Sequence, residues 1–279
     1  MKYMTIRSAT THIDRQNEKF TIECLQSMVD QVNRQYIPAW YAHDPRICPL
    51  GRSISAELVQ LPDGEFAVEE TVQIFEPGDV IDLKNDGRTM PIGNAPPDRL
   101  VIRYDCSYMN PEDQAILCEM RDSVGIEVEE QGKKALEPIS VLVIAASFAL
   151  GQIASGFLSK MGEDAWDFVK GRLAQLLRRK KSEQEDHLLM FSFYVREDDR
   201  VLSLETILTN PTDADIDQFT REGLQLLDQM APEYFRVDPN LVRVVHEYTD
   251  GKVLVRFGVR KDAVPLSLNW QRRANERDS

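Results

Sequence analysis

The stretch Ile139–Leu158 reads ISVLVIAASFALGQIASGFL, and it decides how the rest of the chain is divided. No charged residue occurs between Glu137 and Lys160. A helix of this length would rise about 30 Å, which is the thickness of the hydrocarbon core of a bilayer. Pro138 favours a helix start and Gly162 favours a helix end, so the stretch predicts one central apolar helix.

Small side chains recur along one side of this predicted helix. Ser147, Gly151 and Ser155 are spaced four residues apart, so they form a helix-packing stripe that lets a second helix approach closely. The same residues, together with Gln152, interrupt a purely lipid-facing surface. Three interpretations follow: a transmembrane helix, a buried helix of a soluble hairpin, or a helix that switches between these two states.

The next segment, 162–181, predicts an amphipathic helix with a basic end. Its apolar residues keep a helical spacing, and acidic residues open it. Four basic residues close it: Arg178, Arg179, Lys180 and Lys181. This basic run suits the anionic surface of a membrane, or it complements the negative end of the helix dipole.

Composition excludes several classes of partner and site. The net charge is −13 and the pI is about 4.9, so we expect no nucleic-acid partner, because phosphate contacts need clustered Lys and Arg. The four cysteines contain no close pair and the four histidines form no metal constellation, so no metal, cofactor or disulfide framework is predicted. No secretory signal is recognised near the first residue. We therefore expect a cytoplasmic protein, with attachment to the inner membrane as the alternative.

Strand and helix patterns alternate on both sides of the central helices, which predicts an α+β fold. We expect an N-terminal mixed domain (1–135), the two central helices (136–185), a C-terminal domain (186–270) and a charged tail (271–279). The C-terminal domain has the pattern ββαββ, with one helical region across a sheet.

The N-terminal domain shows several local signals. Thr21 is a helix cap, Asp63-Gly64 marks the turn of a β-hairpin, and Asn110-Pro111 opens a second helix. In the hairpin strand Phe66–Phe75, Glu70 shares a face with apolar residues, where an unpaired carboxylate would cost several kcal/mol. Glu70 is therefore either a paired functional group or a rim residue that turns to water.

Residues 10–75 carry a series of features in a fixed order. These are Asp14 in a polar turn, a helix beginning at Phe20-Thr21, a strand ending in His43-Asp44, the tripeptide Leu50-Gly51-Arg52, and the Asp63-Gly64 hairpin. This order resembles the front half of the phage prohead maturation proteases, which are serine peptidases with the herpesvirus assemblin fold. The resemblance implies an assemblin-like, partly open barrel in the N-terminal domain.

The resemblance also implies catalytic roles. His43 would be the general base for a serine, with a later acidic residue or a second His to orient it. The glycine-containing serine motif of that family has no counterpart here, and Ser107 is the serine at a reasonable distance along the chain. The candidate catalytic set is therefore His43, Ser107 and Glu70.

The leading prediction is a non-catalytic bacterial or phage-derived accessory protein that acts by binding a protein partner. Its central helix would anchor it to a membrane or join copies into a homo-oligomer, and its basic run would contact an anionic membrane. Two alternatives remain: a serine peptidase of the prohead-protease type, and a membrane-disrupting effector whose central helices insert.

Overall fold

The structure, a computed structural model of the 279-residue chain, describes residues 2–13, 19–40, 44–75, 86–91, 99–130, 139–181 and 186–267. Internal contacts group the chain into two compact units. The first unit comprises Met1–Pro91 and Val259–Leu266, and the second comprises Ile92–Gly258 and Ser267–Ser279. Each unit combines strands with helices, which confirms the predicted α+β class.

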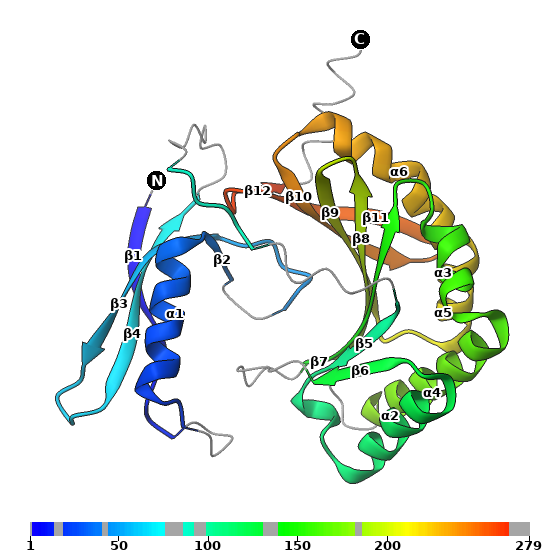
Figure 1. The fold of residues 1–279 in the computed structure, drawn as a ribbon, viewed down its shortest axis with the longest axis horizontal. Helices are drawn as coiled ribbons and strands as arrows, with labels where there is room; N and C mark the ends of the chain where they lie inside the picture. Colours follow the sequence, from blue (N-terminus) through cyan, green and yellow to red (C-terminus); the bar gives the residue numbers. More distant parts are fainter. Residues whose placement is uncertain are drawn as a thin grey trace. The chain divides into compact units, whose positions relative to one another are not determined.

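The first unit contains, within the described residues, a four-stranded antiparallel sheet and one helix (Figure 1). The strand order is β1-β4-β3-β2, with β1 (Lys2–Thr10), β2 (Ile37–Ala39), β3 (Gly51–Gln60) and β4 (Phe66–Ile74). Helix α1 (Ile22–Arg34) packs Leu25 and Val29 against Val68 of β4. The predicted cap and hairpin are confirmed, because the Thr21 hydroxyl accepts a backbone N–H of α1 and β3 pairs antiparallel with β4.

The larger sheet is mixed, has eight strands over the described residues, and belongs to the second unit except for residues 259–266, which are grouped with the first unit. Its order is β12-β11-β10-β9-β8-β7-β5-β6. The strands are β5 (Val101–Tyr104), β6 (Glu127–Glu130), β7 (Ile139–Ala149), β8 (Asp186–Glu197), β9 (Arg200–Thr209), β10 (Leu241–Thr249), β11 (Lys252–Arg260) and β12 (Pro265–Ser267). β7 runs parallel to β8 and antiparallel to β5, while β9 runs antiparallel to β8 and parallel to β10.

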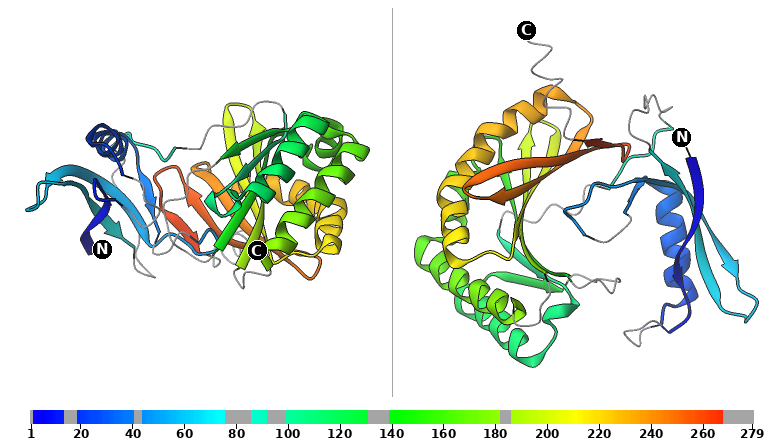
Figure 2. Two further views of the ribbon diagram at one scale, coloured as in Figure 1. Left: turned by 90° about the horizontal axis from the view of Figure 1, so that it is seen from below. Right: turned by 180° about the vertical axis from the view of Figure 1, so that it is seen from behind.

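Figures 1 and 2 show the helices of the second unit on one face of this sheet. They are α2 (Pro111–Val124), α3 (Ile153–Met161), α4 (Glu163–Lys181), α5 (Asp213–Gln218) and α6 (Leu224–Val237). Aromatic rings join helices and sheet: Phe157 of α3 lies 5.0 Å from Trp166 of α4 and 6.2 Å from Phe191 of β8, between ring centroids. These edge-to-face contacts fill the layer between α3, α4 and the central strands.

The stretch Ile139–Leu158 is not one helix, so the central prediction is wrong. Ile139–Ala149 form β7, Gly151 turns the chain with a φ of 73°, and α3 begins at Ile153. Strand β7 lies between β8 and β5, and its residues from 142 to 148 are all buried. A strand buried on both faces needs an apolar run as continuous as that of a buried helix, and this explains the error.

The predicted membrane functions depended on that helix. No helix in the parts of the chain that the structure describes is long and apolar enough to cross a membrane. The predicted transmembrane anchor and the membrane-disrupting effector both required such a helix, so both are wrong. The helix-packing stripe is wrong for the same reason: Ser147 is buried in β7, Gly151 lies in the turn, and Ser155 is exposed on α3.

The second predicted helix and the C-terminal pattern are present. Segment 162–181 corresponds to α4. The order ββαββ appears as β8, β9, the α5–α6 region, β10 and β11. In the helical region, α5 continues through a π-helical turn at Phe219–Gly223 into α6, which includes Pro232 and ends at Val237.

Candidate functional site

Ser107 lies in a 3₁₀ turn, Cys106–Tyr108, that follows β5. Its hydroxyl donates to the Asp105 carboxylate, and its backbone N–H donates to the same oxygen at 3.0 Å. The other carboxylate oxygen accepts the Val141 N–H at 2.8 Å. Asp105 is 4% exposed, so this hydrogen-bonded turn ties the end of β5 to β7 inside the second unit.

The remaining members of the predicted catalytic set are separate from this turn in the chain. Glu70 lies on β4 of the first unit, where the Ser53 hydroxyl donates to its carboxylate at 2.6 Å. The inward carboxylate therefore has a hydrogen-bonding partner within its own sheet. His43 lies outside the described residues. The catalytic set and the resemblance to prohead proteases stay predictions.

The basic run at the end of α4 forms ion pairs within the second unit. Arg178 donates to both carboxylate oxygens of Asp213, at 3.0 and 2.9 Å, and Asp213 opens α5. Arg179 pairs with Glu112 and Asp113 in the first turn of α2, and Lys180 lies 3.3 Å from Asp113. The side chain of Lys181 lies outside the described residues. Three of the four predicted membrane-contacting cations thus neutralise acidic residues at the N-termini of α2 and α5.

A pocket of about 430 Å³ lies where β7 ends and α3 begins, and we call it the β7–α3 pocket. It is lined by Ser147, Phe148, Ala149, Gln152, Gly156, Ser159, Lys160 and Arg196. In the parallel pairing of β7 and β8, Ala149 is the register partner of Arg196, so the carboxyl ends of two neighbouring parallel strands meet here. This is the edge of a sheet at which ligands of open α/β sheets bind.

Local packing shapes the β7–α3 pocket. A Cβ atom at Gly156 would lie 2.9 Å from the Phe148 ring, so glycine at this position lets α3 lie close against the end of β7. The ammonium nitrogen of Lys160 lies 5.5 Å from the centre of the Phe148 ring. That ring therefore forms an apolar wall and also positions a cation beside the pocket.

The N-terminus of α3 is already occupied by a carboxylate of the protein. The two Asp228 oxygens accept the backbone N–H groups of Ile153 and Ala154 at 2.8 and 2.9 Å. These N–H groups are the ones that would otherwise bind an anion at the start of a helix. Any ligand of the β7–α3 pocket must therefore be recognised by side chains.

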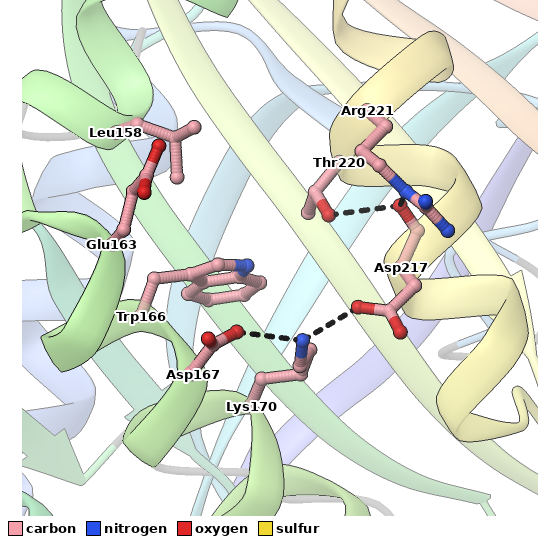
Figure 3. Close-up of a pocket in the computed structure, with 8 residues that line it drawn as sticks. All are labelled: Leu158, Glu163, Trp166, Asp167, Lys170, Asp217, Thr220 and Arg221. Carbon is pink, nitrogen blue, oxygen red and sulfur yellow. Dashed lines mark hydrogen bonds and ion pairs between the residues drawn. The ribbon is translucent and has the colours of Figure 1, made fainter.

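A second pocket, of about 300 Å³, lies between α4 and the α5–π-helical region, and we call it the α4–α5 pocket (Figure 3). It is lined by Leu158, Glu163, Trp166, Asp167, Lys170, Asp217, Thr220 and Arg221. Lys170 bridges Asp167 and Asp217, with nitrogen–oxygen distances of 2.8 and 2.6 Å. The hydrogen bonds from Lys170 to Asp167 and Asp217 raise the pKa of this lysine. Across the described residues, no group of three or more His, Cys, Asp and Glu side chains is placed to hold a metal ion.

Sequence reasoning missed the residues of both pockets. In one continuous helix, Phe148 and Lys160 would lie about three turns apart along the helix axis. In the structure, the turn at Gly151 folds α3 back over the end of β7 and brings the two side chains together. Arg196 reaches the β7–α3 pocket through a parallel pairing between strands far apart in sequence. The available signals were Gly151 as a turn residue and the β-branched residues at the start of the apolar stretch.

The predicted protein partner, the homo-oligomer and the absence of a nucleic-acid partner stay predictions. No model of a known protein family matches the chain, and no curated protein or solved structure matches it. The function is therefore argued from the geometry of the two pockets alone.

Proposed function

We propose that the protein binds a small compound with a phosphate or carboxylate group in the β7–α3 pocket. The observation that carries this proposal is the charge of the lining. Lys160 and Arg196 are both cationic, and none of the eight described lining residues is acidic. This local excess of positive charge occurs in a chain with a net charge of −13, so it is a specific feature rather than a reflection of the average composition.

The two cations approach the pocket from different elements. Lys160 comes from the last turn of α3, and Arg196 comes from the end of β8. Arg196 is exposed and forms no ion pair with any residue that the structure describes. Its planar guanidinium suits bidentate binding of phosphate or carboxylate oxygens, while Lys160 supplies a compact second charge.

The remaining lining residues favour a small organic ligand over a bare ion. The volume of about 430 Å³ falls in the range of pockets that hold small molecules. The Phe148 ring supplies an apolar wall, and Gln152 supplies an exposed amide that donates and accepts hydrogen bonds. The ligand would thus direct its anionic group to the two cations and a less polar portion towards Phe148.

Calorimetric titration with inorganic phosphate and with citrate tests the proposal. We expect both anions to bind, and we expect Arg196→Gln and Lys160→Gln each to weaken binding by about tenfold, because each removes a charge-assisted hydrogen bond. The two probes separate a phosphate from a carboxylate ligand by their relative affinities. Arg34→Gln is the matched control, since it removes the same charge from an exposed residue of α1 in the first unit. Equal affinities in all four proteins would overturn the proposed function.

A further inference from the structure

The α4–α5 pocket differs from the β7–α3 pocket in carrying both signs of charge. Figure 3 shows Glu163 and Leu158 on one side, Arg221 and Thr220 on the opposite side, and Trp166 and Lys170 between them. Trp166 is 4% exposed, so its indole is a fixed part of the wall. The Trp166 indole therefore forms an apolar wall between an acidic residue on one side and a basic residue on the other.

The charges at the base of the α4–α5 pocket are satisfied within the protein. Lys170 lies between Asp167 of its own helix and Asp217, and the pair with Asp217 holds α4 to α5. The Thr220 hydroxyl is also used, because it donates to the backbone oxygens of Ile216 and Asp217 at 2.9 and 3.2 Å. A ligand would find little unsatisfied charge at this base.

Glu163 and Arg221, in contrast, form no ion pair with a described residue, so a ligand can pair with their charges. Glu163 is an exposed residue in the first turn of α4, and it forms no ion pair with a described residue. Arg221 is also exposed; its Nε donates to the backbone oxygen of Asp217 at 3.3 Å, and no carboxylate in the described parts of the chain pairs with it. One acidic and one basic residue thus line the same pocket, Glu163 from α4 and Arg221 from the π-helical turn on the opposite side (Figure 3).

We propose that the α4–α5 pocket binds a zwitterionic, amino-acid-sized compound. Its carboxylate would pair with the Arg221 guanidinium, its ammonium group would pair with Glu163, and its apolar portion would lie against Trp166 and Leu158. A volume of about 300 Å³ suits a ligand of this size. This site is distinct from the β7–α3 pocket, because the two pockets share no lining residue.

The other simple ligand classes fit the charges less well. A bare anion would gain Arg221 but would meet the charge of Glu163. A bare cation would gain Glu163 but would meet the charge of Arg221. A zwitterion satisfies both free groups at once and leaves the net charge of the pocket unchanged.

Calorimetric titration of the full chain with L-leucine and with L-lysine tests the inference. N-acetyl-L-leucine, which lacks the ammonium charge, and L-leucinamide, which lacks the carboxylate, are the blocked probes. We expect at least one of the two free amino acids to bind, and L-leucine to bind about tenfold more tightly than either blocked derivative, because each derivative loses one charge-assisted contact. Absence of binding by both amino acids, or equal binding of the blocked probes, would overturn the inference.

Variants locate the binding in this pocket. Glu163→Gln and Arg221→Gln should each weaken amino-acid binding by about tenfold, because each leaves one end of the zwitterion without its partner. Asp164→Asn is the matched control for Glu163, since it neutralises the next exposed acid outside the pocket. Arg196→Gln is the control for Arg221, and unchanged amino-acid binding there separates this inference from the proposed anion site. Equal losses in the control variants would contradict the assignment.

Discussion

The Nε2 of His246 lies 2.8 Å from the hydroxyl oxygen of Tyr234 in the interior of the second unit. His246 is 0% exposed, and its Nδ1 lies 3.1 Å from the backbone oxygen of Glu205. Because a carbonyl oxygen only accepts hydrogen bonds, Nδ1 carries a proton; burial lowers the pKa of the ring to about 4, so at neutral pH Nε2 is unprotonated and accepts from the Tyr234 hydroxyl. The ring is therefore neutral in the folded protein, and it joins α6 to β10 and β9.

This arrangement predicts a loss of stability in mild acid. Burial lowers the pKa of His246 from 6.5 to about 4, so between these pH values the unfolded chain binds a proton that the folded chain does not. The free energy of unfolding should fall by ~3 kcal/mol from this group as the pH drops from 6.5 to 4. Urea unfolding of the wild type and His246→Gln at several pH values measures the difference. An identical pH dependence in both proteins would contradict this account.

Substitution of Asp113 measures how much unfolding free energy is lost when a buried ion pair is broken. Its carboxylate is 0% exposed and lies 3.3 Å from the ammonium nitrogen of Lys180, whose side chain is 4% exposed. Asp113→Asn should lower the free energy of unfolding by ~3 kcal/mol, because it leaves a buried positive charge without its partner. Glu112→Gln is the control: Glu112 is 72% exposed in its pair with Arg179, so the loss should stay below about 1 kcal/mol. Chemical denaturation that gave equal losses would show that the pair at Asp113 is not the buried contact described.

A substitution at Gly151 is expected to act through backbone strain, whereas the sequence had suggested a role in helix packing. Its φ is 73°, and nothing lies within 4 Å of a Cβ atom placed there. Gly151→Ala should therefore destabilise the protein by about 1 kcal/mol through backbone strain, without overpacking. Gly171→Ala is the matched control, because Gly171 lies inside α4 with equally open surroundings, and alanine there should stabilise by about 0.5–1 kcal/mol. Thermal unfolding should show shifts of opposite sign, and shifts of the same sign would exclude this explanation.

Asp228 is expected to stabilise the folded protein through its contact with the start of α3. Its carboxylate accepts the first two N–H groups of that helix, so Asp228→Asn should cost about 1–2 kcal/mol of unfolding free energy. Asp122→Asn, at an exposed residue of α2, should change stability by less than about 0.5 kcal/mol. Urea unfolding distinguishes the two, and an unchanged midpoint for Asp228→Asn would remove the helix-terminal interaction from the account.

Local signals in the sequence predicted local structure well. The cap at Thr21 and the helix start at Asn110-Pro111 were both confirmed, since each depends only on side chains and backbone N–H groups a few residues apart. Apolar periodicity likewise predicted α4. The stretch Ile139–Leu158 was misassigned because β7 is a central strand between β5 and β8 with residues 142 to 148 all buried, and these neighbouring strands come from elsewhere in the chain.

The two pockets were not predicted because of the same misassignment of Ile139–Leu158. Lys160 and Arg196 are 36 residues apart in the sequence. The parallel pairing of β7 with β8 brings the end of β8, with Arg196, next to α3, with Lys160. In the α4–α5 pocket, Glu163 and Arg221 come from helices joined by the Lys170 ion pairs. Such pairings carry no local pattern that a single sequence reveals, whereas the basic run at the end of α4 was visible and proved to be occupied by ion pairs within the unit.

The most direct test of the anion site is an amide NMR titration of the isotope-labelled protein with inorganic phosphate. Our account predicts that the largest shifts occur at the backbone amides of Ala149, Gln152, Lys160 and Arg196, which line the β7–α3 pocket. The double variant Lys160→Gln/Arg196→Gln should abolish these shifts while the rest of the spectrum stays unchanged. Shifts centred on the basic run at Arg178–Lys181, or shifts that persist in the double variant, would contradict the central claim.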